Sequence, residues 1–459
     1  MVNVWLKKFL AIGMGLVFAV SAKAATPSVN HLVFAHYMVC FATYGPTVDG
    51  YKRDILEAQA AGLDGFALNV GAWSGPDTYY KQRVKLIYDA AEQLGTGFKL
   101  FFSIEIVNTN DIFDIISTYG KRPNSFRHSD KVVVSTYGQN QVDWKGSIFA
   151  PLKVLGIDCF FVPHFWSDPV QELPSYLDGK NILQKYDGLV DGLFLFGAAG
   201  LPAQLAQSNA NYTKAAHDAG KVSMASVTPN YWGAAQYSLG RRYFESDGYE
   251  GLMLQWNAII ANQPDWVEIV TWNDWNESSY MSGVDDPGKY NGSDSLKTLK
   301  RHSHSGYLEL SKRYIAWYKT GQEPATDRDA LFYSYRTHSK DLVAKQTNDA
   351  PVMWFLGDCQ DVVYTTCNLT IPAVLEIQSG DRSTTNSLSS GITHVRVPFS
   401  AGRQTFTLRR EGGDVVSVEG VPIASQIDVH NYFPATGYAY GPTVIPEPPP
   451  VHNLRIVKQ

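Results

Sequence analysis

The sequence is poor in cysteine. It has 4 Cys in 459 residues, too few for disulfides to hold the fold of a secreted protein together. Cys359 and Cys367 lie close enough in sequence to join the two sides of a hairpin. Cys40 and Cys159 fall in elements that we place on opposite sides of a barrel, so we expect these two residues to be unpaired and packed.

Basic clusters and metal-binding motifs are also absent. The formal net charge is −5, and no run of Lys or Arg is longer than two residues. Nucleic acid and anionic membranes require a clustered basic face, so neither is expected as a partner. No CxxC, HExxH or His cluster has the spacing of a metal site, and we expect no metal or other cofactor. An uncharged polymer fits this composition better.

Long apolar runs are confined to the N-terminus. Lys7 and Lys8 precede an apolar run over residues 9–20, and Ala22-Lys23-Ala24 supplies the small-x-small pattern that signal peptidase reads. The run is shorter than the roughly 20 residues of a membrane-spanning helix. We therefore predict a secretory signal over residues 1–24 and a protein that is secreted to the extracellular space or the cell wall. An uncleaved anchor is the alternative.

Short β-rich runs alternate with helical patterns from about residue 31 to residue 319. This order is typical of a parallel sheet with crossover helices, and eight strand–helix units predict a (β/α)8 TIM-type barrel. The expected strands are 31–37, 64–70, 98–106, 131–137, 158–164, 191–196, 221–227 and 266–272. The expected helices include 48–61, 79–94, 111–119, 142–155, 202–219, 248–262 and 305–319.

The pattern changes after Lys319. A polar linker is followed from Leu331 by short alternating runs between Gly, Asn, Asp and Ser turns, which predicts a smaller C-terminal β-sandwich-like domain. The clearest runs are 373–377, 393–398, 405–410 and 415–423. We predict a catalytic barrel over 25–325, an accessory β-domain over 326–444 and an extended Pro-rich tail over 445–459.

Polar and aromatic residues recur where the predicted barrel strands end. In barrels of this type the functional groups lie at the carboxyl ends of the strands. Rings can stack on sugar faces, and amides and carboxylates can bind hydroxyls, so this combination indicates a carbohydrate cleft. The candidate substrate-binding residues are His36, Tyr37, Asn69, Glu105, Tyr137, His164, Trp166, Trp232, Trp272, Asn273 and Tyr280.

Asp274 and Glu277 are the candidate catalytic pair. Three positions apart on a strand they would point to opposite faces, so they converge only if the chain turns there, as Asn273 and Asn276 favour. Two carboxyls in an aromatic-walled site have divergent pKa values, so one can serve as general acid and the other as base. This is the chemistry of glycoside hydrolysis, with carboxyls about 6.5–9.5 Å apart in inverting enzymes and about 5–5.5 Å apart in retaining ones.

Two segments resemble glycoside hydrolase family 71. They are Val33-Phe-Ala-His-Tyr-Met with the downstream Ala60-Ala-Gly-Leu-Asp-Gly-Phe-Ala-Leu-Asn, and Val267-Glu-Ile-Val-Thr-Trp-Asn-Asp-Trp-Asn-Glu-Ser. The resemblance spans the whole mature chain. It implies a secreted endo-α-1,3-glucanase, or mutanase, with a barrel, an accessory β-domain and inversion at the anomeric carbon. It also implies that Asp274 and Glu277 are the catalytic pair.

The sequence departs from the family pattern around this pair. The family usually has Gly-Glu-Ser-His after the Asp, whereas this chain has Asn276-Glu-Ser-Ser. Glu105 replaces an Asp, and the segment from Phe196 to Gly200 lacks the usual Trp residues. These changes affect the subsites more than the reaction.

We assign Glu277 as the general acid, because it lies further into the loop, and Asp274 as the base that activates water; the reverse assignment stays open. The expected partner is an α-1,3-glucan, and the expected state is a monomer. Two alternatives remain, namely the same mechanism on another α-glucan or an α-mannan, and a non-catalytic carbohydrate-binding protein on a hydrolase scaffold.

Overall fold

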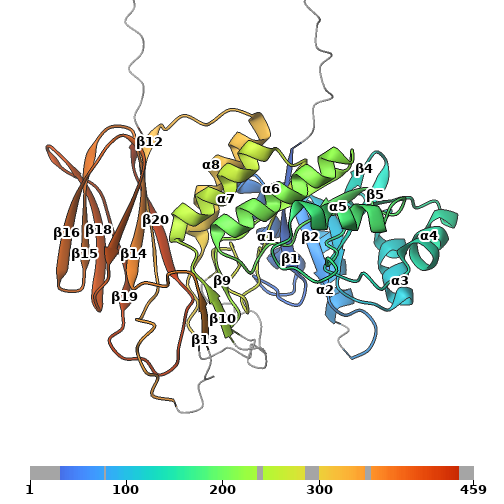
Figure 1. Ribbon diagram of the computed structural model, residues 1–459, viewed down its shortest axis with the longest axis horizontal. Coiled ribbons are helices and arrows are strands. Elements are labelled where there is room, and N and C mark those ends of the chain that lie inside the picture. Colours follow the sequence, from blue (N-terminus) through green and yellow to red (C-terminus); the bar gives the residue numbers. More distant parts are fainter. Residues whose placement is uncertain (1–30, 77–78, 235–240, 285–298, 347–352, 444–459) are drawn as a thin grey trace, which may run out of the picture. The chain divides into compact units, whose positions relative to one another are not determined.

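The computed structural model describes residues 31–76, 79–234, 241–284, 299–346 and 353–443. The chain is α/β up to residue 320, and it consists mainly of β-strands from residue 328 onward (Figure 1). The predicted signal over 1–24 and the predicted tail over 445–459 lie outside the described residues.

Eight parallel strands form the sheet of the α/β part, and each corresponds to one predicted from the sequence. Their spatial order is β6-β5-β3-β2-β1-β11-β8-β7, and the short β4 pairs antiparallel with β5. Every residue of β2 is buried, as expected for a parallel strand covered on both faces. The bounds are β1 Leu32–Met38, β2 Gly65–Val70, β3 Lys99–Ile104, β4 Arg127–His128, β5 Lys131–Thr136, β6 Cys159–Phe161, β7 Gly192–Phe194, β8 Val222–Val227 and β11 Trp266–Ile269.

The two outer strands of this curled sheet are β6 and β7. No ladder joins them among the strands that the structure describes. Two backbone hydrogen bonds span the gap, from Asp191 N to Phe161 O at 2.8 Å and from Phe194 N to Pro163 O at 3.0 Å. The predicted strands and their order are therefore confirmed, whereas a complete barrel goes beyond the observed pairing.

Helices follow most of the strands. In α1, the buried residues Tyr51, Asp54, Ile55 and Ala58 have the spacing of one helix face. The helix α5 was not predicted, because it buries few apolar side chains; a Ser175–Asp178 capping box marks its start. The bounds are α1 Val48–Ala60, α2 Tyr79–Leu94, α3 Thr109–Tyr119, η1 Trp144–Phe149, α4 Ala150–Val154, α5 Tyr176–Lys185, α6 Pro202–Asp218, α7 Gly248–Asn262 and α8 Ser305–Thr320.

Two four-stranded antiparallel sheets make up most of the C-terminal part. Their orders are β17-β14-β12-β20 and β16-β15-β18-β19, and they share a core that includes Leu331, Leu375 and Phe406. The runs predicted after residue 331 are confirmed as strands, whereas the domain boundaries stay predictions. The bounds are β12 Arg328–Tyr335, β14 Val362–Leu369, β15 Ala373–Ser379, β16 Arg382–Leu388, β17 Gly391–Pro398, β18 Gly402–Arg410, β19 Gly413–Ile423 and β20 Ala435–Thr443.

A third, small sheet combines the two parts of the chain. Its order is β13-β10-β9, with bounds Met353–Leu356, Arg241–Phe244 and Tyr231–Trp232. β10 pairs in parallel with β13 and antiparallel with β9. A strand of the C-terminal part thus extends a sheet that begins directly after β8.

The cysteines correct one expectation. All four are free. Cys367 lies in the core between the two antiparallel sheets, and the Cys359 thiol donates to the Leu356 carbonyl at 3.5 Å. The predicted Cys359–Cys367 bridge is therefore wrong, because the two thiols pack into different surroundings. Cys40 and Cys159 are unpaired, as predicted.

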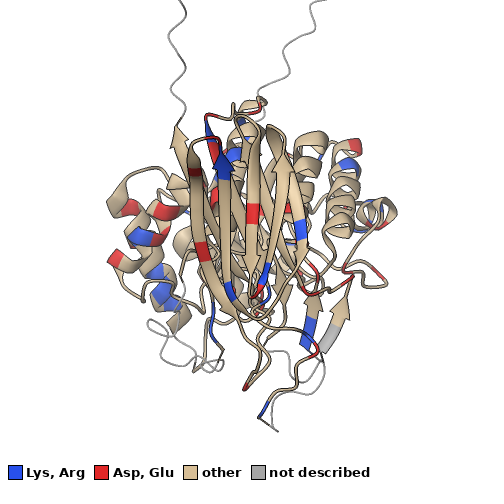
Figure 2. Cartoon of the chain, turned by 90° about the vertical axis from the view of Figure 1, so that its left-hand side faces the viewer, with Lys and Arg blue, Asp and Glu red and all other residues tan. Residues whose placement is uncertain are grey.

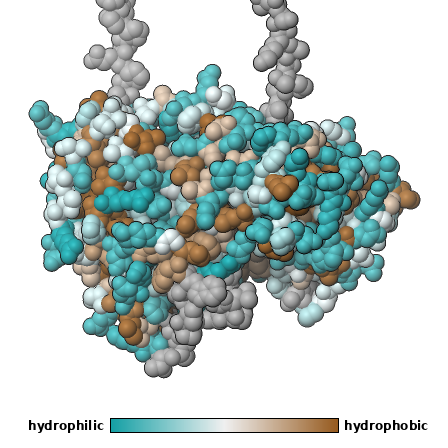
Figure 3. All heavy atoms as spheres, in the orientation of Figure 1, coloured by the Kyte–Doolittle hydropathy of each residue, from teal (hydrophilic) through white to brown (hydrophobic). Residues whose placement is uncertain are grey.

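The faces drawn in Figures 2 and 3 carry residues of mixed charge and hydropathy. In Figure 2, Lys and Arg are interspersed with Asp and Glu. Arg409 of β18 pairs with Glu376 of β15 and with Asp414 of β19. In Figure 3, hydrophobic residues lie among hydrophilic ones. Within the described ranges, no helix has both the length and the apolar character needed to span a bilayer.

Candidate active site

The turn that carries Asp274 begins directly after β11. The peptide bond between Val270 and Thr271 is cis, and the Asp274 N–H donates to Thr271 Oγ1 at 2.8 Å. The N–H groups of Asn276 and Glu277 both donate to Asp274 Oδ1, at 3.0 and 3.1 Å. The Asp274 carboxylate therefore stabilises the turn by accepting hydrogen bonds from the backbone of that turn. The chain turns where β11 ends, as predicted, and the backbone of Glu277 lies beside the Asp274 carboxylate.

The Asp274 carboxyl is held in a buried, polar setting. Its residue is 7% exposed, and burial raises the pKa of Asp274 to about 6. The two backbone N–H bonds lower the pKa, the negative charge of Glu105 raises it, and the positive charge of Arg301 lowers it. Asp274 can therefore change its protonation state in mildly acidic solution.

Glu277 is half-buried and is held by a residue that sequence reasoning missed. The Tyr231 hydroxyl donates to Glu277 Oε1 at 3.0 Å, and the N–H of Trp232 donates to the Glu277 carbonyl at 2.9 Å. Trp232 was the residue predicted here, but side chains alternate along β9, and its neighbour Tyr231 is the one that points toward Glu277. That alternation is the signal that could have identified Tyr231.

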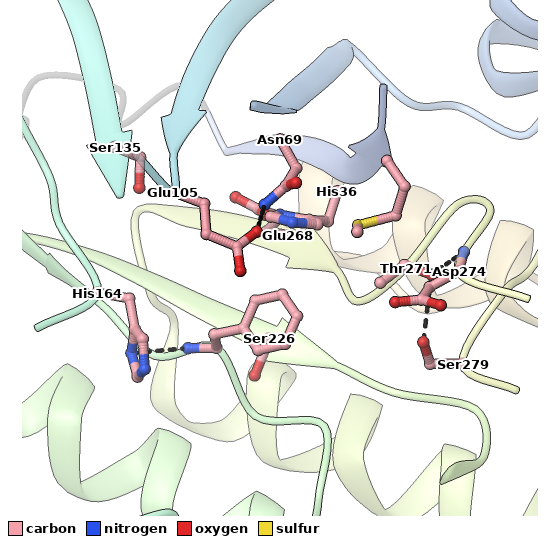
Figure 4. Close-up of polar contacts among 12 residues, drawn as sticks. His36, Asn69, Glu105, Ser135, His164, Ser226, Glu268, Thr271, Asp274 and Ser279 are labelled. Carbon is pink, nitrogen blue, oxygen red and sulfur yellow. Dashed lines mark hydrogen bonds and ion pairs between the residues drawn. The ribbon is translucent and has the colours of Figure 1, made fainter. Parts of the chain in front are cut away.

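Further polar groups lie at the ends of neighbouring strands (Figure 4). Asn69 Nδ2 donates to Glu105 Oε2 at 3.0 Å. His36 Nδ1 lies 2.7 Å from Glu268 Oε1, and both side chains are buried. Burial raises the pKa of Glu268, which the contact with His36 opposes. Three predicted residues, His36, Asn69 and Glu105, therefore lie together in the site.

Aromatic rings form the adjoining side. His164 stacks on Tyr137 at 5.7 Å and meets Trp166 edge-on at 4.7 Å. Phe196 lies 4.7 Å from Tyr137 and 4.9 Å from His36. The segment after β7, which lacks the expected Trp residues, thus contributes the Phe196 ring to this side.

Backbone groups hold the His164 ring. Its Nδ1 lies 3.2 Å from the N atom of Phe196, whose N–H can donate to it, and 3.4 Å from the Phe194 carbonyl oxygen. Burial lowers the pKa of His164 to about 4, so the ring is neutral in mildly acidic and neutral solution. Burial also raises the pKa of Tyr137, and the charges of Glu277, Glu105, Glu172 and Asp274 add to this effect. The acidic residues and the rings therefore share one electrostatic environment.

Tyr37 and Trp272 were predicted at the site, but the structure places them elsewhere. Both are fully buried, and both donate to Asp54 of α1, from the Tyr37 hydroxyl at 2.9 Å and from Trp272 Nε1 at 2.8 Å. Burial raises the pKa of Asp54 to about 7, and the hydrogen bonds from Trp272, Tyr37 and Thr43 oppose the increase. Tyr37 and Trp272 therefore fix the sheet to α1.

We expect Asp54→Ala to lower the free energy of unfolding by about 3 kcal/mol, because the change leaves two buried donors without their acceptor. Asp54→Asn keeps one acceptor oxygen and should lose less. Denaturant unfolding measures the effect. Asp49→Ala is the control, because the Asp49 side chain on the same helix is 94% exposed. An unchanged midpoint for Asp54→Ala would contradict this account.

Three other predicted residues, Asn273, Trp232 and Tyr280, also make contacts that stabilise the fold. Asn273 Nδ2 donates to the carbonyls of Met38 and Phe41, both at 3.2 Å. The Trp232 ring is buried against Phe433 at 4.9 Å, and Tyr280 stacks on His304 at 3.9 Å. These contacts leave no face of Trp232 or Tyr280 at the surface, since both residues are 0% exposed.

The described residues contain no group of three or more His, Cys, Asp or Glu that could hold a metal ion. The chemistry offered by the site is that of carboxylic acids. Asp274 senses the charge of Glu105, and Tyr137 senses the charges of Asp274, Glu277 and Glu105.

A curled parallel sheet whose last strand ends in two acids is an arrangement found in glycoside hydrolases, the class to which this chain belongs. Residues 29–444 match the model of Glycosyl hydrolase family 71, and the chain belongs to that family.

Curated relatives match between 70% and 93% of this chain. The glucan endo-1,3-alpha-glucosidase agn1 of Schizosaccharomyces pombe is 28% identical over 93% of this chain and 98% of its own length. A mutanase of Penicillium rubens is 27% identical over 88% of this chain and 87% of its own. The ascus wall endo-1,3-alpha-glucanase of S. pombe is 27% identical over 70% of this chain and 75% of its own.

Similarity to solved structures is weaker. The GH99 endo-alpha-mannosidase from Bacteroides thetaiotaomicron aligns with a TM-score of 0.48 and 15% identity, over 64% of this chain and 98% of that chain.

Proposed function

We propose that this glycoside hydrolase cleaves α-1,3-glucan within the polymer, with inversion at the anomeric carbon. The observation that carries the proposal is the family membership, combined with names of full-length relatives that specify endo-1,3-alpha-glucanase or mutanase activity. The buried Asp274, hydrogen-bonded to the backbone of Glu277, supports the acid/base chemistry.

In this mechanism, Glu277 gives a proton to the glycosidic oxygen as the bond to the anomeric carbon breaks. Asp274 takes a proton from a water that attacks the same carbon from the opposite face. The product gains the water oxygen in the β-configuration. Two backbone N–H groups fix Asp274 Oδ1, so Oδ2 is the oxygen left to receive the proton.

The role of Asp274 predicts a pH dependence. A base must be ionised, and burial raises the pKa of Asp274 to about 6. We therefore expect kcat/KM on α-1,3-glucan to be lost as the pH falls through about 6 and to be retained above it. A full pH profile of kcat/KM measures this loss of activity on the acidic side. Activity that instead falls as the pH rises through 6 would assign the acid role to Asp274 and the base role to Glu277.

The substrate is tested by reducing-sugar release from insoluble α-1,3-glucan, α-1,4-glucan, β-1,3-glucan and α-mannan. The proposal expects release from α-1,3-glucan alone, with soluble oligosaccharides of several lengths as the sign of cleavage within the chain. Preferential release from α-1,4-glucan or α-mannan would replace the substrate while keeping the mechanism. A folded protein that acts on none of them would contradict the proposal.

We extend the proposal to three features of the whole molecule. The eight strands act as a complete (β/α)8 barrel, which the two backbone hydrogen bonds between Phe161–Pro163 and Asp191–Phe194 support. The protein acts outside the cell or in a cell wall, which agrees with the name of the ascus wall relative. It works as a monomer, which sedimentation of the purified protein would test.

A further inference from the structure

The segment around β9 fixes the catalytic loop at three places. The backbone of Trp232 donates to the Glu277 carbonyl and that of Ala234 donates to the Asn276 carbonyl, both at 2.9 Å. Asn230 Nδ2 donates to Ser278 Oγ at 3.0 Å. The main chain on both sides of Glu277 is therefore bound to β9.

Tyr231, on the same segment, also holds the Glu277 side chain. It is 3% exposed, and its hydroxyl donates to Glu277 Oε1 at 3.0 Å. A phenol that donates to a carboxylate favours its ionised form and restricts its rotamers. The half-buried Glu277 is therefore held at its main chain and at the carboxyl oxygen Oε1.

The Arg242 guanidinium lies over the ring of Tyr231. Phe244 of β10 pairs with Tyr231, and Arg242, two residues earlier on the same strand, lies with its guanidinium carbon 5.8 Å from the Tyr231 ring centre. Arg242 Nη1 donates to Glu172 Oε1 at 2.8 Å and to Glu172 Oε2 at 3.1 Å. Burial opposes the charge of Arg242, but hydrogen bonds and charge interactions with Glu172 and Tyr231 outweigh it and raise the pKa of Arg242. The guanidinium therefore stays charged beside the phenol.

We propose that Tyr231 is a positioning residue for the proton donor Glu277, and that Arg242, anchored by Glu172, orients and polarises the Tyr231 hydroxyl. This inference rests on the proposed function, because it requires Glu277 to be the general acid. The hydrogen bond to Oε1 restricts the rotation of the Glu277 carboxyl group and keeps the donor acidic enough to release its proton.

Tyr231→Phe tests the inference, because it removes the hydroxyl and keeps the ring. We expect kcat on α-1,3-glucan to fall about tenfold. The basic limb of the pH profile should move up by about half a unit to one unit, because the bond that favours the ionised carboxylate is lost. Cleavage of an α-1,3-glucooligosaccharyl fluoride should stay within about twofold, because fluoride leaves without a proton.

Tyr335→Phe is the matched control. The Tyr335 hydroxyl also donates a partly buried hydrogen bond, to the Val421 carbonyl at 2.6 Å, but it lies in the β-rich C-terminal part. This variant should lose similar thermal stability and keep the wild-type kcat and pH profile. Arg242→Gln keeps the Tyr231 hydroxyl and removes the charge beside it. The basic limb of its pH profile should move in the same direction as in Tyr231→Phe, but by less. This variant therefore tests the action of Arg242 through Tyr231 on Glu277 even if Tyr231→Phe fails to fold.

Two results would overturn the inference. One is a wild-type basic limb in both Tyr231→Phe and Arg242→Gln. The other is an equal loss on glucan and on the fluoride, because a merely structural role would impair both substrates. The proposed function fails separately, if Glu277→Gln retains wild-type activity on α-1,3-glucan.

Discussion

Replacing Asp274 by asparagine is expected to lower kcat on α-1,3-glucan by about 10³-fold or more, because an amide cannot take a proton from the attacking water. The amide oxygen can still accept the N–H groups of Asn276 and Glu277, so the turn should persist. Added azide needs no base, and it should restore part of the activity and give the β-glycosyl azide. Kinetics with azide and identification of the product measure this outcome.

The control for this variant is Asp143→Asn. Asp143 Oδ1 also caps a backbone N–H, that of Gly146 at 2.9 Å, but it lies at the start of η1. It should keep full activity. Wild-type activity in Asp274→Asn would remove Asp274 from the mechanism.

Glu277→Gln is expected to separate two kinds of substrate. Activity on α-1,3-glucan should fall by about 10²- to 10⁴-fold, because the glycosidic oxygen leaves without a proton. The corresponding glycosyl fluoride should be cleaved within about tenfold of the wild-type rate, because its leaving group requires no acid. Initial rates on the two substrates provide the comparison.

Glu309→Gln is a close control, because Glu309 Oε1 also accepts a tyrosine hydroxyl, from Tyr440 at 2.9 Å. This variant should behave as wild type on both substrates. If Asp274→Asn instead retains the fluoride activity and Glu277→Gln is rescued by azide, the two roles are reversed.

The strands could be predicted because buried parallel strands are short apolar runs with turn residues between them. The β2 segment is an example, since all of its residues are buried. The helix α5 could not be found in this way, because Gly179, Ile182 and Leu183 are its only buried residues. The pairing of β10 with β13 links segments more than 100 residues apart, and local patterns carry no information about it.

Only part of the site could be predicted, because the position of a residue at a strand end does not show which face of the sheet its side chain occupies. His36 and Tyr37 are neighbours on β1, so they point to opposite faces, and only His36 reaches the interior of the sheet, where it meets Glu268. Tyr37 must then contact the helix layer, where Asp54 accepts its hydrogen bond. The burial of Trp232 depends on Tyr432 and Phe433, about 200 residues away, which sequence position alone does not reveal.

The stereochemistry of the first product tests the central claim most directly. Proton NMR during hydrolysis of a soluble α-1,3-glucooligosaccharide follows the anomeric signals before mutarotation mixes them. The pair Asp274 and Glu277, acting as base and acid on opposite sides of the anomeric carbon, predicts that the β-anomer forms first. An α-anomer that forms first would contradict this account, because it requires a covalent intermediate and a nucleophile in place of the base.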